Sequence, residues 1–138
     1  MLGRPPFSIA QLMAEISWPA GWTRDGAGPR IGLVETAGGV RSPQADDGDV
    51  LDLVRRLRPD LVVLVADAGL GTINAVRLSA DALVGCGLAP ECLVVVLNRF
   101  DPADDLHRRN RLWLTDRDGL SVLVTPGDEA RLGTLVAE

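Results

Sequence analysis

The residues around Glu35 combine a carboxylate with small neighbours, a pattern that could hold a metal ion and a phosphate. Glu35 ends the apolar run at residues 31–34, and Gly38 and Gly39 follow shortly after it. Mg²⁺ typically takes one or two carboxylates together with substrate phosphates. Glycines let backbone N–H groups approach an anion closely. A plainer interpretation stays open, in which Glu35 caps a loop and the glycines only turn it.

The stretch DAGLGTIN, residues 67–74, is a second candidate for binding an anion. Gly69 and Gly71 give the turn its freedom, and Thr72 and Asn74 fall in the first turn of the helix expected next. The unpaired N–H groups and the dipole of a helix start attract anions. A tight turn with ordinary capping accounts for the same residues equally well.

Two further segments could recognise a nucleotide base. Asn98 follows an apolar run, and its amide offers a donor and an acceptor that can match the edge of adenine. Pro126 stiffens the turn in TPGDE, residues 125–129, where acidic residues open a helix and suit its dipole. Local loop and capping roles remain the alternatives for both segments.

Strand-like and helix-like patterns alternate along the chain, and this alternation predicts the fold that positions these residues. Four apolar strands separated by helices indicate a three-layer α/β domain over 1–138, with a mostly parallel sheet covered on both faces. Ligands of such sheets bind where the strands end. The predicted strands are 31–35, 60–66, 92–98 and 121–125; the helices are 8–16, 49–57, 72–84, 103–115 and 127–137; the loops include 18–30 and 36–48.

Composition excludes several classes of protein. The net charge is −5, so there is no electrostatic case for binding nucleic acid or an anionic membrane. No run is long and apolar enough to span a bilayer, and the N-terminus does not read as a signal peptide, so we expect a cytoplasmic protein. Cys86 and Cys92 lack a metal-ligand spacing and are expected to be buried thiols. The basic stretch at 107–111 is expected to be a salt-bridged helix face.

Four segments in this order resemble dethiobiotin synthetase, a ligase of the P-loop NTPase class. They are VETAGGVRSP at 34–43, LVADAGLGTIN at 64–74, VVLNRF at 95–100 and, more loosely, TPGDEARL at 125–132. The resemblance implies a cytoplasmic homodimer that uses ATP and Mg²⁺. In the implied reaction CO₂ carboxylates an amine of 7,8-diaminononanoate, ATP activates the carbamate, and the neighbouring amine closes a cyclic urea.

The resemblance also implies a role for individual residues, none of them catalytic in itself. Glu35 corresponds to a Mg²⁺ ligand, and Asn98 to the residue that contacts adenine. Pro126 and Glu129 correspond to residues that line the base and ribose. The implied substrate-binding residues are Gly38 and Gly39 near the reacting groups and, for the substrate carboxylate across a dimer interface, Leu70, Gly71, Thr72 and Asn74.

The chain departs from the family pattern in two respects. Thr36 stands where the family usually has glycine, and the phosphate loop G-x-x-x-x-G-K-[ST] is missing from a chain that contains no lysine at all. We therefore expect the chain to match the C-terminal part of the family fold and to be inactive by itself. A non-catalytic P-loop-like module for binding or dimerisation is the alternative function.

The missing phosphate loop also affects the predicted sheet. In the family, the strand before that loop lies between the strands that end here at Glu35 and Ala66. Three solutions are open: another chain or segment supplies the strand, the two edges pair directly, or the chain is a fragment of a longer protein.

Overall fold

The computed structural model describes residues 6–17 and 31–137. They form two compact units, one up to Arg58 and one over residues 59–136. The single domain expected over 1–138 stays a prediction. The predicted loop at 18–30 lies outside the described residues.

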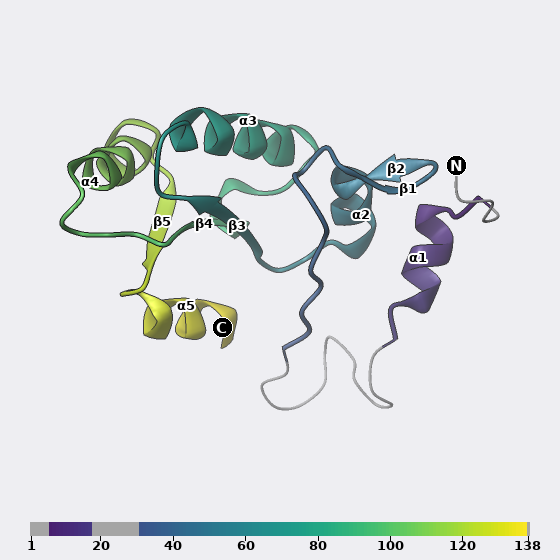
Figure 1. The fold of residues 1–138 in the computed structure, drawn as a ribbon. Coiled ribbons are helices and arrows are strands. Elements are labelled where there is room, and N and C mark those ends of the chain that lie inside the picture. Colours follow the sequence, from purple (N-terminus) through teal and green to yellow (C-terminus); the bar gives the residue numbers. More distant parts are fainter. Residues whose placement is uncertain (1–5, 18–30, 138) are drawn as a thin grey trace. The chain divides into compact units, whose positions relative to one another are not determined.

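The first unit contains two capped helices and a short hairpin (Figure 1). Its elements are α1 (Ile9–Glu15), β1 (Pro43–Ala45), β2 (Gly48–Asp49) and α2 (Val50–Leu57). Ser8 caps α1 and Asp49 caps α2, each accepting hydrogen bonds from backbone N–H groups in the first turn. Both helices were predicted, α2 with its acidic cap.

The predicted strand at 31–35 is wrong. Residues 31–36 belong to no strand, and the apolar side chains of Ile31, Leu33 and Val34 are exposed. A strand exists only by pairing, and this segment has no ladder partner among the described residues. The loop predicted at 36–48 instead contains β1 and the start of β2, which pair antiparallel.

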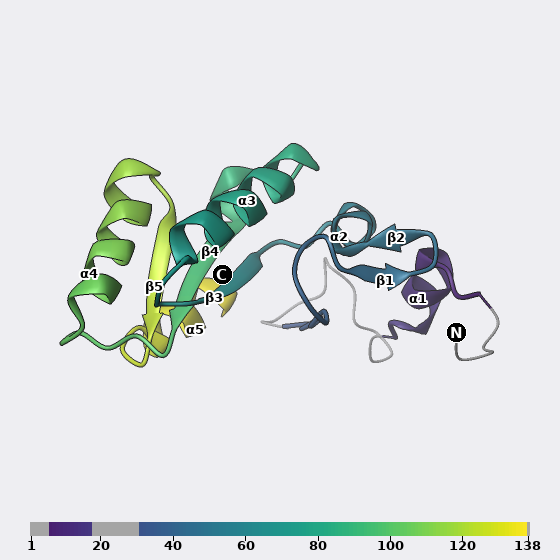
Figure 2. The ribbon, with the colours of Figure 1, turned by 45° about the horizontal axis from the view of Figure 1, so that its top comes forward.

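The second unit is the parallel α/β sheet that the sequence predicts. Its strands are β3 (Val62–Asp67), β4 (Leu93–Asn98) and β5 (Ser121–Thr125), with β4 in the centre and all pairs parallel (Figure 2). The helices are α3 (Thr72–Gly85), the short η1 (Pro90–Cys92), α4 (Asp105–Leu112), the π-helical turn η2 (Trp113–Arg117) and α5 (Glu129–Ala137).

Helices cover both faces of this sheet, and Figure 1 shows α3 and α5 on opposite sides of the strands. On one face Val95 and Leu97 pack against Val76 of α3 and Leu114 of η2. On the other face Val94 and Val96 contact leucines of α5. All five residues from Leu93 to Leu97 are buried, which is the pattern of a central parallel strand.

The edge strand β3 is less covered than β4. Its side chains alternate between half-buried and exposed, and Val65 is 60% exposed. Within the described residues β4 is its one ladder partner, so the outer row of its backbone groups is unpaired.

Two predictions from the sequence concern the cysteines and possible membrane-spanning helices. Cys86 and Cys92 form no disulfide and are half-buried. In the part of the chain that the structure describes, every helix is too short or too polar to cross a bilayer.

Candidate functional site

The loop that joins β3 to α3 is a candidate anion-binding element. Asp67 ends the strand, and one of its carboxylate oxygens accepts a hydrogen bond of 2.8 Å from the N–H of Gly69. Gly71 has a φ of 90°, in the left-handed region that favours glycine. It directly precedes the 14 residues of α3, and no side chain caps this helix start. The N–H of Thr72 donates to the carbonyl of Gly69 at 3.4 Å, and the next N–H groups of α3, those of Ile73 and Asn74, are available to an anion.

Thr72, the first residue of α3, provides an independent sign of a missing ligand. Its side chain is only 4% exposed, and its hydroxyl oxygen has no hydrogen-bond partner among the described residues. An unsatisfied buried hydroxyl costs about 1–3 kcal/mol. Because buried hydroxyls are normally hydrogen-bonded, the Thr72 hydroxyl is a candidate contact for a bound polar group or a water molecule.

Thr72 lines a cavity of about 270 Å³ on β3 and α3. Its polar lining consists of Gly71 and Thr72 at the helix start together with Asp67 and Ser79, and the other lining residues are apolar. Those apolar lining residues are Leu64, Val65, Ala66, Leu70, Ala75 and Val76. A cavity that combines a helix start with an apolar wall can take a polar group on an aliphatic chain.

The four residues predicted to receive the substrate carboxylate thus come from one turn of the chain. Leu70, Gly71 and Thr72 line the cavity, and Asn74 lies in the first turn of α3 with an exposed side chain. Leu70 is 94% exposed, so its side chain adds apolar surface at the mouth of the cavity.

The loops after β4 and β5 lie side by side, as expected for the ends of neighbouring parallel strands. The side-chain oxygen of Asn98 accepts hydrogen bonds from the N–H of Arg99 at 2.9 Å and from the Thr125 hydroxyl at 3.2 Å. The N–H of Phe100 donates to the carbonyl of Thr125. The amide oxygen of Asn98 is thereby occupied, and its NH₂ group has no partner among the described residues.

Pro126 and Glu129 follow β5 in the same region. Pro126 is exposed, and the Glu129 carboxylate accepts a hydrogen bond of 2.9 Å from the N–H of Gly127. Glu129 thus has a local contact in the turn before α5. Its predicted contact with a ribose, like that of Pro126 with a base, stays a prediction.

Glu35, Gly38 and Gly39 belong to the first unit. Because residues 31–35 form no strand, Glu35 does not lie at a strand end as the sequence predicted; its side chain is exposed. Gly38 has a φ of 81°, and a Cβ there would collide with Ser42. Among the described residues, no group of three or more His, Cys, Asp or Glu side chains could hold a metal. A single carboxylate is enough for a Mg²⁺ ion that is held mainly by phosphates. The role of Glu35 as a Mg²⁺ ligand stays a prediction.

An ion pair joins the loop after β3 to the loop after β4. The Arg99 guanidinium donates to the second carboxylate oxygen of Asp67. The N–H of Gly69 and then this guanidinium hold the pKa of Asp67 below its ordinary value, so the carboxylate stays charged at neutral pH. Asp67 therefore contacts both the loop after β3 and the loop after β4.

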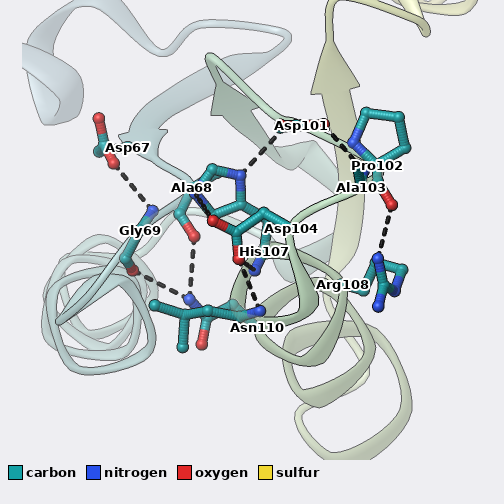
Figure 3. A network of polar contacts seen from close by, with 11 residues as sticks. Asp67, Ala68, Gly69, Asp101, Pro102, Ala103, Asp104, His107, Arg108 and Asn110 are labelled. Atoms are coloured by element: carbon teal, nitrogen blue, oxygen red, sulfur yellow. Dashed lines mark hydrogen bonds and ion pairs between the residues drawn. The ribbon is translucent and has the colours of Figure 1, made fainter.

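Sequence reasoning missed Asn110, which contacts the β3–α3 loop from α4 (Figure 3). The basic stretch at 107–111 is the salt-bridged face that was predicted: Arg108 and Arg109 pair with Asp105, and Arg111 pairs with Asp128. Asn110 is buried beneath these arginines and bonds to the loop. The one available signal was that it is the single uncharged, non-titratable residue in the stretch.

Comparisons with known proteins agree with this architecture. A family model described as an AAA domain matches residues 8–125. The ATP-dependent dethiobiotin synthetase BioD of Haloferax mediterranei is 37% identical over 103 residues, which cover 75% of this chain and 41% of that protein. The BioD of Saccharopolyspora erythraea is 41% identical over 110 residues, covering 80% of this chain and 45% of that protein.

The chain therefore spans less than half the length of these relatives. No solved structure gives a significant match. The family model covers most of the chain, and the two synthetases match 75% and 80% of it. The chain belongs to this AAA-domain family and, within it, to the dethiobiotin synthetase family.

Proposed function

We propose that this chain is part of a dethiobiotin synthetase-like enzyme of biotin biosynthesis, to which it contributes the pocket for the substrate carboxylate. The observation that carries the proposal is the unpaired, buried hydroxyl of Thr72 at the uncapped start of α3. A carboxylate there accepts hydrogen bonds from this hydroxyl and from the first N–H groups of the helix. The apolar wall of the cavity then takes the aliphatic chain of 7,8-diaminononanoate.

The proposal includes ATP and Mg²⁺, consistent with relatives that are named ATP-dependent. In this chain the NH₂ group of Asn98 is the donor that would reach an acceptor of adenine, with Pro126 and Glu129 beside the base and ribose. Glu35 would hold Mg²⁺. When bound, Mg²⁺ neutralises charge on the transferred phosphate. The phosphate loop comes from another segment or chain.

We further propose that the enzyme is a homodimer. Leu70 beside the cavity and Leu78 on α3 are exposed large apolar residues. A second copy that covers them would close the cavity and exclude water from it. Sedimentation of the chain at increasing concentration is expected to show dimers.

Replacing Thr72 with valine tests the carboxylate pocket. Because valine keeps the shape but removes the unsatisfied hydroxyl, Thr72→Val is expected to raise the free energy of unfolding by about 1 kcal/mol without ligand. The same change removes a hydrogen bond to a charged group and is expected to weaken 7,8-diaminononanoate binding about tenfold or more. Chemical denaturation and calorimetric titration measure the two effects.

Thr134→Val in α5 is the matched control, because the Thr134 hydroxyl is exposed and bonds only to the carbonyl of Ala130. It is expected to leave ligand affinity unchanged. Equal affinities of Thr72→Val and the parent chain would contradict the proposed carboxylate site.

The absence of lysine favours a second candidate function, a non-catalytic module that binds a ligand or dimerises. In that case Glu35 has no partner ion to hold. Glu35→Ala would then leave the binding of ATP and Mg²⁺ unchanged, whereas the synthetase-like function requires that it weaken the binding of Mg²⁺ with ATP.

A further inference from the structure

We infer that Asn110 is a positioning residue that fixes the β3–α3 loop in the shape required to bind a ligand. This inference rests on the proposed function only for the identity of that ligand. The Asn110 side chain reaches the loop across 42 and 41 positions of sequence. Its NH₂ group donates to the carbonyls of Ala68 and Gly69, both at 2.9 Å (Figure 3).

The two acceptors are the carbonyls that set the path of the chain into α3. Ala68 is completely buried, and the carbonyl of Gly69 also accepts a hydrogen bond of 3.4 Å from the N–H of Thr72. Asn110 therefore holds the same carbonyl that orients the first amide of α3. A shift of this carbonyl would redirect the first amides of α3.

Gly69 is held from both sides by side chains. Its N–H donates to Asp67, and its carbonyl accepts from Asn110. A loop with both backbone groups of one residue fixed has few alternative shapes, so little ordering is left to occur when a ligand binds.

Packing alone does not account for an asparagine at this position. Asn110 is only 5% exposed and lies on the side of α4 that faces the sheet. Leucine is a better helix former and would bury more apolar surface at such a position. A buried amide is favourable only when its hydrogen bonds are made. The hydrogen bonds to the two loop carbonyls explain why an asparagine stands at position 110.

The same helix also holds the loop after β4. His107, one turn before Asn110, accepts a hydrogen bond of 3.0 Å at Nδ1 from the N–H of Asp101. Arg108 donates to the carbonyl of Pro102 at 2.7 Å. Because α4 contacts both loops, the position of one loop is fixed relative to the other by a single rigid element.

Hydrogen exchange tests the positioning role without any ligand. Asn110→Ala is expected to lower the protection of the Gly69 and Thr72 amides about tenfold. Amides in the second half of α3 should change much less. Leu123→Ala is the control, because Leu123 is buried in the other core cluster, with Val94 and Val96, and has no part in the contacts of Asn110. Its effect is expected to be similar across the amides of the unit.

Asn110→Leu provides a second variant that fills the site without leaving a cavity and has a higher helix propensity than asparagine. It is expected to reproduce the local loss of protection. A uniform loss in both variants would show a merely structural role and would overturn the inference, and so would unchanged protection of the loop.

Calorimetric titration with 7,8-diaminononanoate then connects the loop to binding. Asn110→Ala is expected to raise the Kd about tenfold, whereas Leu123→Ala leaves it unchanged under conditions in which both variants are folded. If the parent chain fails to bind this probe, the proposed function fails, and the exchange experiment still decides the role of Asn110. If the parent binds and the Asn110 variants bind equally well, the positioning role is excluded.

Discussion

Adding a polypeptide that carries the strand and G-x-x-x-x-G-K-[ST] loop of a dethiobiotin synthetase to this chain is expected to raise dethiobiotin formation about 10³-fold or more over either part alone. Phosphoryl transfer depends mainly on positioned charge, and a single such group can contribute about 10²–10³-fold. This chain contains no lysine to provide it. Within residues 6–17 and 31–137 the outer edge of β3 has no ladder partner, and the added strand can bind there.

The measurement is the formation of dethiobiotin from 7,8-diaminononanoate, CO₂ and ATP with Mg²⁺. A supplied polypeptide whose loop lysine is replaced by alanine is the control and should return the rate to background. An assembled complex that binds ATP and still makes no dethiobiotin would contradict the proposed function.

The change Leu114→Ala is expected to destabilise the second unit by about 2–5 kcal/mol. Leu114 in η2 is 0% exposed and belongs to the core that packs on Val95 and Leu97. Truncating such a residue loses its burial and leaves a cavity. Domains are stable by only about 5–15 kcal/mol, so much of the native stability would be lost.

Leu112→Ala is a matched control two residues away, since Leu112 is 56% exposed. It is expected to change the free energy of unfolding by less than about 0.5 kcal/mol. Urea denaturation of both variants measures the difference. Equal effects would mean that η2 does not pack on the sheet as described.

The elements that the sequence predicted well are those whose patterns are local. The apolar runs of β4 and β5 indicate buried strands because no polar residue interrupts them. Asp49 marks the start of α2 because its carboxylate satisfies N–H groups of the first turn wherever the helix lies. The glycine-rich loop before Thr72 was likewise recognisable from residue types alone.

The features that sequence reasoning missed depend on contacts between distant segments. Residues 31–35 have the composition of a strand, but a strand also needs a neighbour, which composition does not reveal. Asn110 stands among arginines and looks like part of a solvated face. Its burial follows from the position of Ala68 and Gly69, 41 or 42 residues earlier.

The open edge of β3 has a consequence for the behaviour of the chain in solution. Residues 62–66 are all apolar. The strand therefore contains neither a charged residue nor a proline that would hinder another strand from pairing with its outer backbone groups. Edges of this kind template the stacking of further chains and promote aggregation. A strand bound at this edge would cover the surface on which aggregates grow. The tendency of the chain to aggregate is therefore expected to fall when the sheet is completed.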